Sequence, residues 1–126
     1  MRKATRPWIK KAEDDYETAE NLSAGVKRLY DQICFHCQQC VEKYLKALLE
    51  ESAQTIPKIH DCVKLFRLLP ADYQSLNAFQ RGFTTLNRYA VATRYPGENA
   101  TRRQAASALR WAVKVRTVCR EFLGLK

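Results

Sequence analysis

Apolar residues recur at steps of three and four along nearly the whole chain, which is the spacing of one face of an α-helix. Alternating strand patterns are absent, as are the Asn-Gly and Asp-Gly pairs that favour hairpins. With 126 residues, 46% of them hydrophobic, the chain is long enough to bury a core of its own. The sequence therefore predicts a single all-α domain over residues 1–126.

Turn-forming residues divide this pattern at Gly25, Pro57, Pro70 and a loop at about 92–100. Thr101 is the expected N-cap of the last helix. Helices are expected over about 6–23, 27–52, 61–69, 72–89 and 101–123. Because short connections favour antiparallel neighbours, the predicted architecture is an up-and-down antiparallel bundle of about five helices.

The N-terminal residues carry basic side chains with no apolar stretch behind them, so no secretory signal is expected. No apolar run approaches the ~20 residues that span a bilayer. The five cysteines, an odd number without a framework spacing, are expected to be free thiols. We therefore expect a cytoplasmic protein that does not enter a membrane.

Positive charge is concentrated in the second half of the chain. Residues 1–63 hold 10 basic and 10 acidic side chains, whereas residues 64–126 hold 12 basic and 3 acidic ones. The expected last helix carries most of a basic surface that is completed by the loop before it: Arg94, Arg102, Arg103, Arg110, Lys114, Arg116 and Arg120. This surface favours an anionic partner such as nucleic acid, a nucleotide or an acidic protein, and the alternative is a solvated basic face.

The longest expected helix has a polar side on which His36, Gln39, Lys43 and Glu50 fall within about 60° of one another. Such a stripe can receive a phosphate or polar ligand, and the alternative is a solvated face with one surface histidine. Phe35 lies among these polar residues, which indicates contact with a partner helix or a second subunit.

Cys34, Cys37 and Cys40 lie near His36, a set that raises the question of zinc. Cys37 and Cys40 fall on the apolar face of the helix, and no second pair follows at zinc-finger spacing. We therefore expect core cysteines, no metal and no cofactor. Asp61, next to His60, is expected to cap the short third helix.

Several enzyme signatures are missing: the P-loop, Gly-x-Gly-x-x-Gly, the Gly-x-Ser-x-Gly elbow and the glycosidase carboxylate pair. No residue is assigned a catalytic role.

Residues 35–49 read FHCQQCVEKYLKALL. This run resembles the signature helix of the HEPN domain family, in which Phe-His-x-x-Gln-x-x-Glu-Lys-x-Leu-Lys-Ala is typical. The resemblance continues at Lys-Ile-His-Asp (58–61), at Arg-Tyr-Pro (94–96), a motif of one HEPN subgroup, and along the first helix at residues 8–16.

The resemblance implies a five-helix homodimer with a groove near the dimer seam that faces a nucleotide or RNA. Many relatives pair with a minimal nucleotidyltransferase as its substrate-binding-like subunit, and some are toxin ribonucleases with an Arg followed four to six residues later by His. Neither Arg88 nor Arg94 has a histidine downstream. The resemblance therefore implies a non-catalytic nucleotide- or phosphate-binding module.

The residues expected to contact the ligand are His36, Gln39, Lys43, His60, Arg94 and Tyr95. Lys43 and Arg94 would meet phosphate, and Tyr95 would stack. One alternative is the ribonuclease toxin of a toxin–antitoxin pair, with His36 or His60 replacing the missing histidine. Another is a structural adaptor whose basic second half docks an acidic partner.

Overall fold

The computed structural model describes residues 1–91 and 95–126, which hold five α-helices, two 3-10 helices and no strand. The elements in chain order are η1 (Lys3–Thr5), α1 (Arg6–Ala24), α2 (Tyr30–Glu51), α3 (Cys62–Arg67), η2 (Ala71–Phe79), α4 (Gln80–Asn87) and α5 (Arg102–Phe122). The all-α prediction is confirmed.

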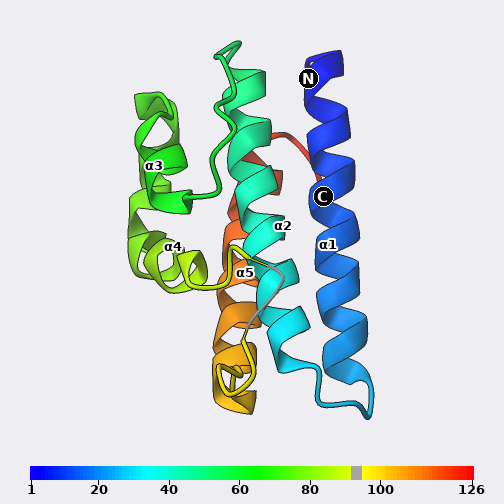
Figure 1. Ribbon diagram of the computed structural model, residues 1–126. Coiled ribbons are helices and arrows are strands. Elements are labelled where there is room, and N and C mark those ends of the chain that lie inside the picture. Colours follow the sequence, from blue (N-terminus) through cyan, green and yellow to red (C-terminus); the bar gives the residue numbers. More distant parts are fainter. Residues whose placement is uncertain (92–94) are drawn as a thin grey trace.

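The chain runs down α1, up α2, back along one flank through α3, η2 and α4, and up α5 (Figure 1). The chain returns through α3, η2 and α4 before α5 begins. Helices α2 and α5 therefore lie side by side and run in the same direction. At their starts, Asp31 accepts a hydrogen bond from the Ala100 amide at 2.6 Å. Near their far ends, Arg120 donates to the Tyr44 hydroxyl at 3.4 Å. Helix α2 is therefore enclosed by α1, α5 and the flank.

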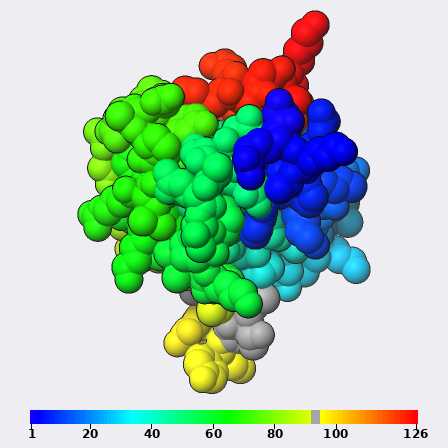
Figure 2. All heavy atoms as spheres, turned by 90° about the horizontal axis from the view of Figure 1, so that it is seen from above, coloured from blue at the N-terminus to red at the C-terminus, as the bar shows by residue number. Residues whose placement is uncertain are grey.

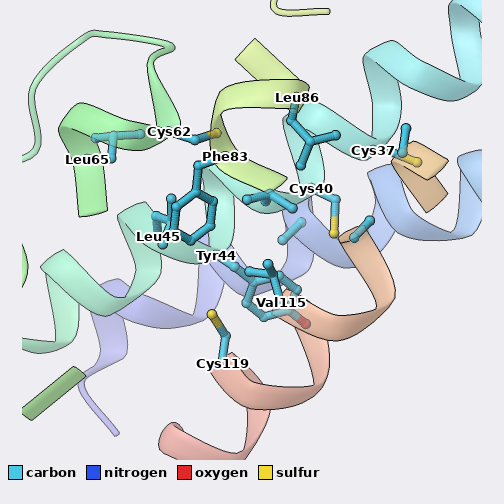
Figure 3. Close-up of a cluster of buried hydrophobic side chains, with 14 of the residues drawn as sticks. Cys37, Cys40, Tyr44, Leu45, Cys62, Leu65, Phe83, Leu86, Val115 and Cys119 are labelled. Atoms are coloured by element: carbon cyan, nitrogen blue, oxygen red, sulfur yellow. The ribbon is translucent and has the colours of Figure 1, made fainter. Parts of the chain in front are cut away.

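Side chains from α2 occupy the centre of the core, where Tyr44 and Leu45 are fully buried (Figure 3). Phe83 of α4 and Val115 and Cys119 of α5 pack around them, also fully buried. Burying one such aliphatic or aromatic side chain contributes about 1.5–3 kcal/mol. Packing of α1, α4 and α5 onto α2 thus holds the surface of α2 in place.

Local signals place two helix starts as predicted. Thr101 caps α5: its side chain accepts from the Gln104 amide, and Gln104 accepts from the Thr101 amide, which completes a capping box. Asp61 caps α3 by accepting from the Lys64 amide at 3.1 Å. These caps fix the residues at which α3 and α5 begin.

The predicted helix over 72–89 is wrong in its first half, which is the 3-10 helix η2 with a kink at Tyr73 (φ −104°, ψ 17°). Contacts with α5 explain the difference. The Tyr73 ring lies edge-on to Phe122 at 4.9 Å between centroids, and a Cβ at Gly82 would lie 2.5 Å from the Trp111 ring. The segment follows the surface of α5, so tertiary packing overrides the helical period.

Candidate ligand-binding face

One side of α2 is only partly covered by the rest of the molecule. Between Ile33 and Glu50, every residue of α2 is buried except five that are partly exposed: Phe35, His36, Gln39, Lys43 and Glu50. The polar members of this set are the four that the sequence placed on one stripe. We call the surface they form, together with their carboxylate partners below, the α2 polar face.

Asp15 of α1 joins two side chains of the α2 polar face, His36 and Lys43. Its carboxylate lies 2.8 Å from Nδ1 of His36 and 2.5 Å from Nζ of Lys43. The Asp15 side chain is 12% exposed, against 28% for His36 and 20% for Lys43. Since Nδ1 is bound, Nε2 is the ring nitrogen that His36 keeps for a ligand. Asp15 therefore orients both residues and partly neutralises them.

Glu42 is the centre of a second cluster and is 3% exposed. One oxygen lies 3.0 Å from Nδ1 of His60 and accepts from Gln38 and Gln39 at 3.3 and 3.4 Å. The other accepts from Lys46, four residues along the same helix, at 3.1 Å. Gln38 also donates to the His60 carbonyl at 2.8 Å, so the segment before α3 is fixed to α2.

The structure thus places four of the six predicted contact residues in two clusters: Asp15 links His36 and Lys43, and Glu42 links Gln39 and His60. Arg94 lies outside the described residues. Tyr95 is 78% exposed, in a loop that projects from the body of the molecule (Figure 2).

The predicted basic surface on α5 is divided. Arg116 binds both oxygens of Glu13 on α1 at 2.7 Å, and Arg120 lies 3.5 Å from the same carboxylate. Burial raises the pKa of Glu13, but hydrogen bonds from Arg116 and Tyr44 outweigh it and hold this pKa below its ordinary value. Arg102, Arg103, Arg110 and Lys114 remain exposed. The part of the surface open to an anion is therefore smaller than the sequence indicated.

The cysteines lie in the core. All five are buried, and burial raises the pKa of Cys37, Cys62 and Cys119. Among the described residues, no three His, Cys, Asp or Glu side chains are grouped so as to hold a metal ion.

The two carboxylates at the centre of the face were not assigned as site residues from the sequence. Asp15 is 21 positions from His36 and 28 from Lys43, so their contact depends on how α1 crosses α2. For Glu42 a local signal existed, because it stands at the i−4 position from Lys46. Asn87 was also missed: it donates to Asp61 at 2.8 Å and accepts from the Cys62 amide at 2.8 Å.

The fold and the site define an all-helical domain with one charged, partly open helix face. The model of the HEPN domain family matches residues 5–122. The chain therefore belongs to the HEPN domain family.

Two crystal structures are similar to this chain. TT1696 from Thermus thermophilus is 26% identical with a TM-score of 0.83, over 95% of this chain and 98% of that one. ST0689, described as an archaeal HEPN homologue, is 27% identical with a TM-score of 0.74, over 96% of this chain and 98% of that one. None of the curated proteins matches. Within the described residues, no helix is both long and apolar enough to cross a bilayer.

Proposed function

We propose that this chain is a non-catalytic HEPN module that binds a nucleotide or another phosphate ligand on the α2 polar face. It acts in the cytoplasm as a homodimer and as the partner of a minimal nucleotidyltransferase. The observation that carries the proposal is that Asp15 holds the partly exposed His36 and Lys43, and that Glu42 holds the exposed His60. Such pre-oriented donors suit a multiply charged anion.

The role of each residue in ligand binding follows from the hydrogen-bonding positions that its contacts within the protein leave unused. Lys43 uses one ammonium proton on Asp15 and has two left for phosphate oxygens. His36 and His60 each keep Nε2 for the ligand, since Nδ1 is bound by a carboxylate. From the sequence, Arg94 adds a further phosphate contact and Tyr95 a ring on which a base stacks.

Calorimetric titration with a non-hydrolysable ATP analogue tests this site. The double variant Lys43→Ala, Arg94→Ala is expected to weaken binding at least tenfold, because it removes two charged contacts to phosphate. Lys10→Ala is the matched control: Lys10 is also paired with an α1 aspartate, at 2.6 Å from Asp14, but lies on the exposed side of that helix. Equal affinity in the double variant and the control contradicts the proposed site.

A second candidate function, metal-independent RNA cleavage, is favoured by the two carboxylate–histidine pairs, Asp15–His36 and Glu42–His60. One histidine would take the proton of a ribose 2′-hydroxyl as it attacks the phosphorus. The other would protonate the departing 5′-oxygen, which leaves a 2′,3′-cyclic phosphate. Incubating the purified protein with RNA tests this function. Cleavage that disappears in His36→Ala or His60→Ala supports it, and intact RNA with the wild type excludes it.

A further inference from the structure

A hollow of about 380 Å³ opens at the end of the bundle where α1 passes into α2 and where α5 begins (Figure 1). Its walls come from these three helices and from the connection between α1 and α2. They include three apolar residues and three cations: Leu22, Ile33, Ala106, Lys27, Arg28 and Arg102. We call it the basic hollow. It shares no lining residue with the α2 polar face, so it is a separate surface of the molecule.

Every charged residue that lines the basic hollow is a cation. Lys27 and Arg28 lie exposed on the connection between α1 and α2, and Arg102 is the exposed first residue of α5. Within residues 1–91 and 95–126, none of these three side chains forms an ion pair. Arg116 differs from them, because Glu13 already binds it. The positive charge at the hollow is therefore available to an anionic partner.

The helix that begins at the basic hollow does not explain these charges. The first turn of α5 carries Arg102 and Arg103 and no acidic residue. Positive charge at a helix N-terminus is unfavourable, because the helix dipole is positive there. Arginines in this turn therefore weaken the start of α5, and carboxylates brought by a partner would offset that cost.

The inner side of the basic hollow is apolar. Ile33 and Ala105 are 3% and 4% exposed and form its floor. Leu22 and Tyr30 are partly exposed beside them, and Val26 stands 98% exposed at the rim. A cationic rim around an apolar floor matches a peptide segment in which carboxylates flank an apolar side chain. A nucleic-acid backbone matches the rim alone.

We propose that the basic hollow is the docking site for an acidic segment of a partner protein, in which Asp or Glu residues flank an apolar side chain. The carboxylates lie against Lys27, Arg28 and Arg102, and the apolar side chain enters the hollow against Ile33. The net charge of +9 on the chain favours the approach of such a partner. This inference does not rest on the proposed function, because no residue of the α2 polar face lines the hollow.

A random-peptide display library, panned on the immobilised wild-type protein, is the first test. Peptides with acidic residues on both sides of a leucine, isoleucine or phenylalanine are expected to be enriched. The most enriched peptide is then labelled with fluorescein and titrated by fluorescence anisotropy. Enrichment without an excess of acidic residues, or no saturable binding up to about 1 mM, overturns the proposal.

A double variant tests the charged rim. Lys27→Ala, Arg102→Ala is expected to weaken binding of the peptide about fivefold, the size of two exposed ion pairs. The matched control Lys64→Ala, Arg67→Ala removes the same charge from exposed residues of α3, outside the hollow, and is expected to bind like the wild type. Equal weakening in both variants overturns the proposal, because general attraction between opposite charges would then explain it.

A substitution that fills the hollow tests its apolar part without changing the charge. Ala106 is exposed on α5 and lines the hollow. Ala106→Trp is expected to weaken the peptide about tenfold, because the indole occupies the space of the apolar side chain. Val113→Trp is the matched control, seven residues further along the same exposed side of α5. Equal affinities of Ala106→Trp and the wild type overturn docking inside the hollow.

Other occupants of the hollow would give different results. A single-stranded RNA oligonucleotide that binds the wild type more tightly than the peptide does, and that loses affinity in Lys27→Ala, Arg102→Ala, assigns the hollow to nucleic acid. A dimeric wild type beside a monomeric Lys27→Ala, Arg102→Ala variant in sedimentation assigns it to a second copy of the chain. Either result overturns the proposal.

The proposed function fails separately from this docking site. Lys43→Ala, on the α2 polar face, is expected to keep the wild-type affinity for the peptide. A wild type that does not bind the ATP analogue but binds the peptide in the basic hollow overturns only the proposed function. A wild type that binds the analogue but no acidic peptide overturns only the docking site.

Discussion

At the scale of single residues, the carboxylates of Asp15 and Glu42 set the position and the net charge of the lysine and histidine side chains beside them. Each carboxylate binds one lysine and one histidine, so within each cluster the carboxylate balances the charge of its lysine.

Adjacent aspartates of α1 allow a matched test of this role. Asp15→Asn is expected to lower the free energy of unfolding by about 1–3 kcal/mol, because Lys43 and His36 lose a buried anionic partner. Asp14→Asn removes only the exposed pair with Lys10 and is expected to cost much less, because solvent screens that pair. Urea denaturation measures both, and equal losses contradict the role given to Asp15.

At the scale of elements, Glu13 joins α1 to α5, and this ion pair makes the stability of the fold depend on pH in the acid range. The pKa of Glu13 is held below its ordinary 4.5, so its stabilising effect is complete above that value and is lost as pH falls through the folded pKa. Glu13→Gln is therefore expected to flatten the loss of stability below pH 4.5. Urea midpoints between pH 3 and pH 7 measure it, and Glu17→Gln, exposed on the same helix, should keep the wild-type slope.

Helices α4 and α5 approach closely at Gly82. An alanine there would normally favour the helix by about 1 kcal/mol, but its Cβ would lie 2.5 Å from the Trp111 ring. Gly82→Ala is therefore expected to destabilise the protein by about 1–3 kcal/mol, as overpacking does. Gly25→Ala is the control, because its Cβ would come no closer than 3.4 Å to any neighbour. A higher melting temperature for Gly82→Ala would show that Trp111 moves aside freely.

Sequence reasoning succeeded where the information is local to one helix. The long elements α1, α2 and α5 each carry an apolar period over about five turns, so their existence and their polar faces follow from helix geometry. The prediction of an α-helix was wrong for residues 71–79, because their contacts with α5 decide their conformation. The pairing of Asp15 with His36 and Lys43 could not be predicted from the sequence either, since it depends on how two helices cross.

At the scale of the whole molecule, the proposed homodimer needs a surface that α2 itself supplies. Phe35 is the aromatic member of the partly exposed set on α2, and its ring lies edge-on to His36 with 5.3 Å between centroids. An aromatic residue among polar ones is typical of the centre of a protein interface. A seam at Phe35 would bring the α2 polar faces of two protomers together, so that each ligand site is bordered by the partner.

Sedimentation equilibrium tests this placement of the seam. The wild type is expected at twice the 14.6 kDa mass of the chain, and Phe35→Asp is expected to give monomers, because a charge would be buried without a partner. Val26→Asp is the control, since Val26 is 98% exposed on the α1–α2 connection and should leave the dimer intact. Monomeric wild type contradicts the dimer, and a dimer that survives Phe35→Asp contradicts a seam at this residue. If the seam is there, Phe35→Asp also weakens ATP binding, because the ligand site loses its border along with the partner.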